Sequence, residues 1–317
     1  MMKFSRLITL LAMLSMLLGA CETAATAGPV TLRIAVLPIL DALPMYVAQQ
    51  EGLFADHDVI VEFVPAGSAA ERDQIILAGQ ADGMINDAIS TLLYNKDDIQ
   101  VQIVRFARTA TSTFPQYRIL ASAQSGITNV ELLSEVPIGI SEGTIIQYVN
   151  ERLLTAEGLP VDAITTIAVP NISERMQLLA SGELQAAVMP DPLSDLAIQQ
   201  GALVVIDDTA HPEYGFSTYA FRLPVIEQYP QAIRGFLAAI EEAIALVNAD
   251  PTAWDTVLTE QNLVPASLIG SYKMPAFPLA SIPSQAQWED ALAWTHEQGL
   301  VSVDIAYSES VTGAYLP

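Results

Sequence analysis

The sequence predicts an α/β protein of two lobes, each a mostly parallel sheet flanked by helices, in which two crossover segments form a hinge. Two observations carry this prediction. Short apolar strand patterns alternate with helix patterns along most of the chain, which is typical of parallel sheets. After two such series, the strand pattern at 216–221 is expected to return the chain to the first lobe. The expected lobes are therefore 30–117 plus 215–317, and 118–214.

The N-terminal segment predicts export and lipid attachment. Its basic start and the apolar run Leu7–Leu18 are typical of a signal peptide, because the run is too short to span a bilayer. The run ends in Leu18-Gly19-Ala20-Cys21, which resembles the lipobox of bacterial lipoproteins and implies cleavage before Cys21 and lipidation there. An ordinary cleavage site beside a chance cysteine is the alternative. We expect a signal peptide at 1–20 and a flexible tether at 21–29, with the protein extracytoplasmic and held at the cell membrane only by lipid.

The charge balance excludes several classes of partner. The chain carries 36 acidic and 13 basic side chains, and loss of the leader with its two basic residues brings the net charge to −25. Nucleic acids and anionic membrane surfaces need a basic face, so neither is an expected partner. Cys21 is the single cysteine, and His57, His211 and His296 stand far apart in the sequence. No disulfide, metal site or cofactor is therefore expected.

The first strand and helix lie between Thr31 and Phe54. Residues 31–37 are apolar and β-branched, as in a buried strand, and a proline ends the run. Asp41 is expected to cap the following helix, and Pro44 to lie in its first turn, where a missing N–H costs no hydrogen bond. Gly52 marks the helix end. A strand that leads directly into a helix N-terminus exposes backbone amides where open α/β sheets bind ligands.

The rest of the first series is a regular alternation. Ser68 and Glu71 have capping-box spacing ahead of a helix that Gly79 ends. The expected strands are 59–64, 82–85 and 101–106, and the expected helices run to about residue 78 and over 88–95.

The second series begins near Tyr117. Its expected strands are 118–123, 138–140, 164–169, 186–189 and 202–206, and its helices end near residues 158, 180 and 200. Ser173 is expected to cap the second of these helices. Two long helices follow at 230–248 and 285–298, the latter with Ser284 as cap and Gln287 at its third position.

Four segments carry a resemblance to a known family. LPILDALPMYVAQQEGLF, AGSAAERDQIILAGQADGMINDA, ISEGTIIQYV and MPDPLSDL resemble segments of the periplasmic-type solute-binding proteins of ABC importers. The branch includes binders of sulfonates, taurine, nitrate, thiamine precursors and riboflavin. The resemblance implies a monomeric transport protein, not an enzyme, that delivers a small ligand to a permease and an ATPase encoded elsewhere.

Polar side chains at the turns after strands are the candidate ligand-binding residues. Each has an alternative role as a helix cap or, for the tyrosines, as part of the core. In the first lobe they are Asp41, Tyr46, Ser68, Asn86, Asp87 and Ser90. In the second lobe they are Glu142, Thr144, Tyr148 and Asp191. No catalytic residue is predicted.

The acids among these residues decide the expected ligand. Asp41, Asp87, Glu142 and Asp191 would repel an anion, and only Arg72 is close by in sequence. The favoured ligand is therefore a neutral heteroaromatic vitamin or precursor, either riboflavin or the pyrimidine precursor of thiamine. The alternatives are a sulfonate, taurine or nitrate-type anion, and a pyrimidine-synthase-like enzyme.

Overall fold

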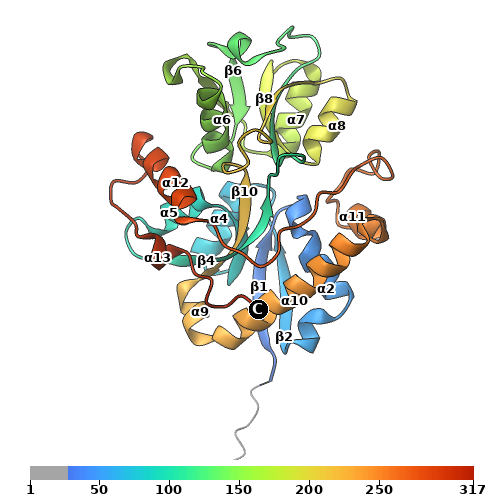
Figure 1. The fold of residues 1–317 in the computed structure, drawn as a ribbon, viewed down its shortest axis with the longest axis vertical. Helices are drawn as coiled ribbons and strands as arrows, with labels where there is room; N and C mark the ends of the chain where they lie inside the picture. Colours follow the sequence, from blue (N-terminus) through green and yellow to red (C-terminus); the bar gives the residue numbers. More distant parts are fainter. Residues whose placement is uncertain (1–27) are drawn as a thin grey trace, which may run out of the picture.

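The structure is a computed structural model that describes residues 28–317, so the predicted signal peptide and Cys21 lie outside the described residues. It contains two five-stranded sheets flanked by helices, which occupy the lower and upper halves of Figure 1. We call the sheet with strands from 30–109 and 216–222, with its helices, the first lobe. The sheet with strands from 117–207, with its helices, is the second lobe. Within the described part of the chain, no helix is long and apolar enough to cross a membrane.

The first lobe alternates strands and helices. Its elements are β1 (Val30–Val36), the 3-10 turn η1 (Leu40–Ala42), α2 (Leu43–Gln50), α3 (Leu53–Asp56), β2 (Val59–Pro65), α4 (Ala69–Leu77), β3 (Gly83–Asn86), α5 (Ala88–Asn95) and β4 (Val101–Thr109). A later strand, β10 (Phe216–Arg222), inserts between β3 and β4 and gives the order β2-β1-β3-β10-β4. β1 is parallel to β2 and β3, whereas β10 is antiparallel to both its neighbours.

The second lobe repeats this plan. Its elements are β5 (Tyr117–Ala121), η2 (Val130–Leu133), β6 (Pro137–Ile140), α6 (Ile145–Ala156), η3 (Val161–Ala163), β7 (Thr165–Ala168), α7 (Ile172–Ser181), β8 (Ala186–Pro190), α8 (Leu193–Gln199) and β9 (Leu203–Asp207). The order is β7-β6-β8-β5-β9, with β5 antiparallel to both its neighbours.

The strand that enters each sheet from the other lobe is the one that runs against the rest. In each sheet the other four strands point the same way, so their carboxyl ends meet at one edge. The chain passes between the lobes twice, at 109–117 and at 207–216 (Figure 1). The predicted α/β fold class, with two lobes and two crossovers, is confirmed. The boundaries drawn for the lobes stay a prediction.

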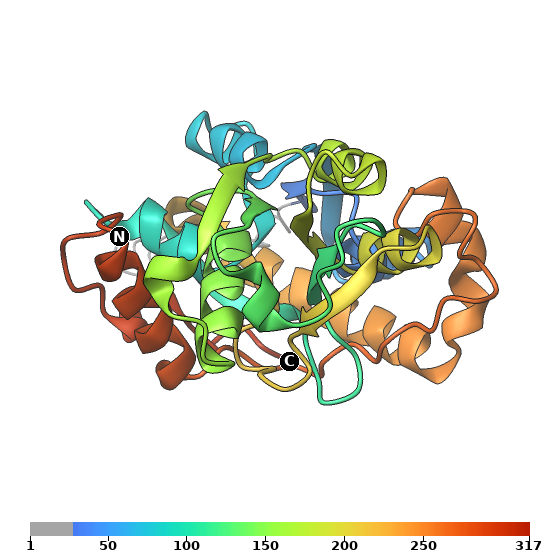
Figure 2. The same ribbon diagram turned by 90° about the horizontal axis from the view of Figure 1, so that it is seen from above.

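The C-terminal helices pack mainly on the first lobe, and one of them reaches the second. They are α9 (Leu223–Gln228), α10 (Pro230–Ala249), η4 (Pro251–Trp254), α11 (Asp255–Glu260), α12 (Gln285–Glu297) and α13 (Tyr307–Ser310). The apolar stripe of α10 is buried, with Phe236 stacked on Phe54 of α3. The capping box predicted for α12 is present. This helix lies beside α6 in Figures 1 and 2, and Trp294 donates to Glu151 at 2.7 Å.

Two predicted helix caps are wrong. Asp41 lies inside η1, and neither η1 nor α2 has a side-chain cap, because the carboxylate turns inward to other partners. Helix α7 begins earlier than predicted, and Asn171 rather than Ser173 caps it by accepting from the Glu174 amide at 3.0 Å. Pro44 does lie in the first turn of α2, as predicted.

Candidate ligand-binding site

A cavity of about 60 Å³ lies where the carboxyl ends of strands in the two lobes face each other. Most of its lining is apolar. The charged or amide side chains that reach it are Arg72, Asn86 and Asp87 from the first lobe and Arg175 from the second. The volume is far below the roughly 300–1,000 Å³ of sites that hold drug-sized ligands, so this state of the protein admits only a small group.

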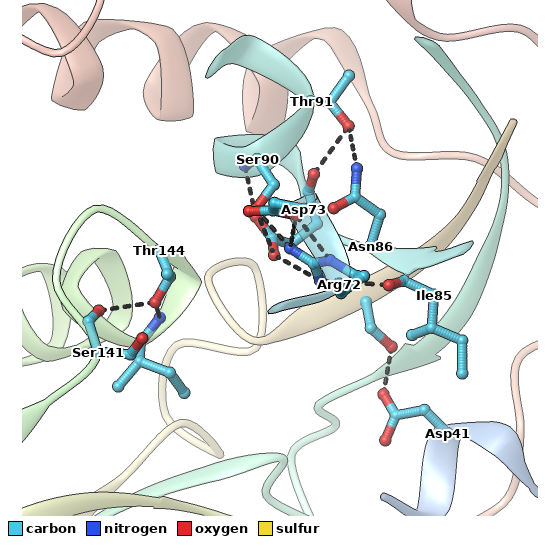
Figure 3. Close-up of polar contacts among 12 residues, drawn as sticks. Asp41, Arg72, Asp73, Ile85, Asn86, Ser90, Thr91, Ser141 and Thr144 are labelled. Carbon is cyan, nitrogen blue, oxygen red and sulfur yellow. Dashed lines mark hydrogen bonds and ion pairs between the residues drawn. The ribbon is translucent and has the colours of Figure 1, made fainter. Parts of the chain in front are cut away.

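Arg72, on α4, has its charge balanced within the first lobe. Its Nε donates to Asp73 Oδ1 at 2.9 Å, and its Nη2 donates to Ser90 Oγ at 2.7 Å. Its Nη1 donates to the Ile85 carbonyl at 3.2 Å and lies 3.6 Å from Asp87 Oδ2. Figure 3 shows Asp73, Ser90 and Ile85 around the guanidinium. Two carboxylates therefore neutralise this arginine.

Arg175, on α7, is buried and has no counterion among residues 28–317. Its Nε donates to the Val188 carbonyl at 2.9 Å and its Nη1 to the Val169 carbonyl at 2.7 Å, while Nη2 has no hydrogen-bond partner. Its exposed fraction is 0%. Burial lowers the pKa of Arg175 to about 10, which still leaves it protonated at neutral pH. A buried cation with free N–H groups at a cavity is able to pair with an anionic group.

The two arginines occupy equivalent places in the two lobes. Both follow a glutamate, both precede a glutamine by two residues, and both donate to a strand carbonyl thirteen residues further on. The two lobes differ at the position two residues after that carbonyl. The first lobe has Asp87 two residues after Ile85, and the second lobe has Pro190 two residues after Val188. Proline carries no charge, so the second arginine lacks the counterion that the first one has.

Asn86 ends β3 and contributes an unpaired acceptor. Its Nδ2 donates to Thr91 Oγ1 at 2.9 Å, and this hydroxyl in turn donates to the Asp87 carbonyl, which fixes the orientation of the amide. Asn86 lines the cavity, and its Oδ1 atom is buried with no partner in the described part of the chain. It can therefore accept one hydrogen bond from a ligand or a water molecule.

Asp87 takes the alternative role of a helix cap, and its contact with a ligand stays a prediction. Its Oδ1 accepts the Ser90 amide at 2.8 Å at the start of α5. Burial raises the pKa of Asp87, and Arg72 opposes that rise. The Ser90 hydroxyl contacts both charged groups, because it accepts from Arg72 and lies 3.3 Å from Asp87 Oδ2.

Asp41 and Asp191 belong to a charge network at the connections between the lobes. Arg108, on β4, donates from Nη2 to Asp191 Oδ2 at 2.6 Å, and its Nη1 lies 3.7 Å from Asp41 Oδ2. Asp41 also accepts from Ser217 and from Gln116 Nε2. Neither carboxylate lines the cavity. Burial raises the pKa of Asp41, and Arg108 counteracts it.

A third carboxylate, Asp208, joins the two connections to each other. It lies after β9 and accepts the backbone amides of Gln116 at 2.9 Å and Tyr117 at 3.1 Å. A Cβ at Gly215 would lie 1.8 Å from Asp208 Oδ2, so only glycine allows this approach. Burial raises the pKa of Asp208 from 3.8 to about 7, against the effect of the two amide bonds.

This shifted group predicts a pH dependence of stability. Between pH 4 and 7 the folded protein holds a proton on Asp208 that the unfolded chain has lost, so its contribution to the free energy of unfolding falls as pH rises through this window. From pH 4 to pH 7, we expect the free energy of unfolding of wild type to fall by about a few kcal/mol relative to that of Asp208→Asn. Urea unfolding of both proteins at pH 4.5, 6 and 7.5 measures the difference, and a constant difference would contradict the prediction.

The other predicted polar residues are placed as helix caps or outside the cavity. Ser68 caps α4 by accepting the Glu71 amide at 3.1 Å. Thr144 caps α6, and its hydroxyl donates to the Ser141 carbonyl at 2.7 Å (Figure 3). Glu142 is exposed and does not line the cavity. Contact of these three with a ligand stays a prediction.

The two predicted tyrosines are packed away from the cavity. Tyr46 lies against Phe63, with ring centroids 4.6 Å apart. Tyr148 faces α12, where its hydroxyl donates to Asp290 at 2.6 Å. Neither lines the cavity, and their contact with ligand stays a prediction without support from this geometry.

The expectation that four acids would repel an anion does not fit the geometry. Asp41, Asp87 and Asp191 each lie near an arginine, and Glu142 lies outside the cavity. The residue that sequence reasoning missed is Arg175. Its signal was the recurrence of Glu-Arg-x-Gln followed five residues later by glycine, at Glu71 and again at Glu174. Within residues 28–317, no three His, Cys, Asp or Glu side chains form a group that could hold a metal ion.

Solved structures with this fold include both binding proteins and an enzyme. The alkanesulfonate-binding protein SsuA from Xanthomonas axonopodis pv. citri, bound to MOPS, is 18% identical with a TM-score of 0.75, over 90% of this chain and 99% of that one. The periplasmic nitrate-binding protein NrtA from Synechocystis PCC 6803 is 15% identical with a TM-score of 0.73, over 90% and 86%. The desulfurization enzyme DSZB is 14% identical with a TM-score of 0.66, over 90% and 97%. At these identities the likeness establishes the fold alone.

Sequence comparison is more specific about the family. No protein with a curated description matches the chain. The family model described as NMT1/THI5 like matches residues 40–253, which include β3, α4, the two connections and both cavity arginines. The chain therefore belongs to the NMT1/THI5-like family.

Proposed function

We propose that this protein is the extracytoplasmic solute-binding subunit of an ABC import system and that it captures a small anion of the sulfonate or nitrate type. The observation that carries the proposal is Arg175, a buried guanidinium with free N–H groups and no counterion at an interlobe cavity. Burying a charged group costs free energy unless the group is paired. Arg175 is already buried, so an anion that pairs with it offsets that cost.

The size of the cavity and the similar structures support an anion over a flavin. About 60 Å³ accommodates a sulfonate or nitrate group, whereas a tricyclic ring with a ribityl chain needs a site several times larger. Among the similar structures are a binder of alkanesulfonates and a binder of nitrate. Of the four carboxylates that favoured a neutral ligand, Asp41, Asp87 and Asp191 are paired with arginines and Glu142 lies outside the cavity.

Binding between the lobes gives the transport mechanism. A ligand that contacts Arg175 in one lobe and Asn86 in the other stabilises the closed arrangement by its higher affinity for that state. The closed pair of lobes forms a joint surface for the permease, and the ATPase drives release into the importer. The protein acts as a monomer, and no covalent step is needed.

One observation favours a second candidate, the pyrimidine precursor of thiamine. The unpaired Asn86 Oδ1 can accept from a ring amine, which a plain anion does not offer. This candidate leaves Arg175 without a counterion, so it ranks below the anion.

A thermal-shift screen tests the function. The purified protein without its leader is heated with methanesulfonate, taurine, nitrate, riboflavin and an aminopyrimidine, each at equal ionic strength. We expect one or more anions to raise the melting temperature, with no turnover of the ligand on incubation. A rise with riboflavin or the aminopyrimidine alone would overturn the proposed ligand class, and turnover would indicate an enzyme.

The predicted lipid anchor has its own test. Cys21→Ser removes the thiol that lipidation needs, so the expressed protein should move from the membrane fraction to the soluble extracytoplasmic fraction. Cell fractionation with immunoblotting measures the distribution. Retention at the membrane equal to that of wild type would contradict lipid anchoring.

A further inference from the structure

We propose that Asp87 sets the charge selectivity of this site, so that it takes monoanions and rejects dianions such as sulfate. The inference rests on the proposed function, because it concerns the charge of the anion held there. It assigns Asp87 a specificity role in addition to its role as the cap of α5.

The Asp87 carboxylate has a fixed position in the cavity wall. Asp87 lines the same cavity as Arg175 and is 2% exposed, so water does not screen its charge from a ligand there. Its Oδ1 is held by the Ser90 amide, and its Oδ2 lies 3.6 Å from Arg72 Nη1. The carboxylate is therefore fixed in place and cannot turn away from an incoming anion.

Of the two cavity arginines, one keeps a charge that the protein does not compensate. Arg72 is matched by Asp87 within the cavity wall and by Asp73 behind it. Arg175 remains as the unpaired cation. One unpaired positive charge compensates one buried negative charge, and the second charge of a dianion would meet Asp87 in a low-dielectric setting.

The two lobes differ at the position that Asp87 occupies in the first lobe. Pro190 stands where the second lobe would carry the equivalent of Asp87, so the two equivalent arginines have different net charge around them. With acids at both positions the site would hold no free cation. With none, Arg72 would keep only Asp73, a partly exposed carboxylate behind the wall, so the cavity wall would carry two arginines and no acid, which would favour a dianion. The single aspartate therefore corresponds to a monoanion.

Calorimetric titration of two sulfur oxyanions tests this step. Methanesulfonate and sulfate share tetrahedral sulfur and differ in charge, and both are titrated at pH 8 and constant ionic strength into wild type, Asp87→Asn and Asp195→Asn. Asparagine caps a helix about as well as aspartate, so Asp87→Asn keeps the start of α5. Asp195 is an acid paired with Arg118 at 2.8 Å outside the cavity lining, which makes it the matched control.

We expect wild type to bind methanesulfonate more tightly than sulfate and Asp87→Asn to shift the ratio of the two affinities toward sulfate by fivefold or more. Asp195→Asn should keep the wild-type ratio. A smaller shift in Asp87→Asn, with wild type still binding methanesulfonate, overturns the inference and leaves the proposed function intact. If wild type binds neither anion, the inference is overturned, and the thermal-shift screen with taurine and nitrate decides the proposed function. If Asp87→Asn folds poorly, Asp87→Ser takes its place, because serine keeps a capping oxygen without the charge. The same ratio of affinities is then measured.

Discussion

Arg175→Met is expected to weaken anion binding by about 2–5 kcal/mol, or roughly 30-fold to a few thousandfold. Methionine has similar length and no charge, so the substitution removes the cation and its free N–H groups without opening a large cavity. The same change relieves the burial of an unpaired charge, so we expect little loss of stability despite the lost bonds to Val188 and Val169. Calorimetric titration with methanesulfonate and thermal melting measure the two effects separately.

Two further variants sharpen this result. Arg175→Lys keeps the charge but loses the planar fork of donors, so its affinity should fall between those of wild type and Arg175→Met. Arg234→Met makes the same chemical change at an exposed position on α10 and should leave affinity unchanged. Full affinity in Arg175→Met would remove this arginine from the binding site.

Arg108→Met is expected to destabilise the protein by about 3–5 kcal/mol, because it leaves Asp41 and Asp191 buried without their shared cation. For a chain of this size the loss corresponds to a fall in melting temperature of roughly 5–8 °C. The penalty should shrink as pH is lowered, since burial raises the pKa of Asp41 and its protonation removes one uncompensated charge. Thermal melting between pH 5 and 8 measures both the size and the direction.

The exposed Arg234→Met variant is again the control, with an expected change within about 0.5 kcal/mol. An Arg108→Met protein that melts with wild type would show that the carboxylates are neutral or solvated in solution. A penalty that grows toward low pH would contradict the assignment of the network.

Much of the fold could be predicted from sequence because local patterns determine it. Strands such as β2 are apolar and β-branched, and caps such as Asp87 and Ser284 precede helices with the expected spacing. The return of β10 to the first sheet followed from a strand pattern placed after a complete second series. Asp41 failed as a cap because a tertiary contact with Ser217 and Gln116 competes for its carboxylate.

The chemistry of the site was harder to predict because it depends on pairings across the chain. Asp191 looked like a free acid in sequence, yet its partner Arg108 lies in the other lobe. Arg175 sits inside a helix whose other residues are unremarkable, and its missing counterion is visible only beside the matched environment of Arg72. Sequence reasoning named two of the residues that line the cavity, Asn86 and Asp87, but not which charges cancel there.

The most direct test of the central claim is a crystal structure of the protein grown with methanesulfonate. An anion bound between the lobes, with a sulfonate oxygen about 2.7–2.9 Å from the Arg175 guanidinium, is the result that we predict. A cavity filled by water alone beside an unpaired Arg175, with the anion absent or bound elsewhere on the surface, would contradict it.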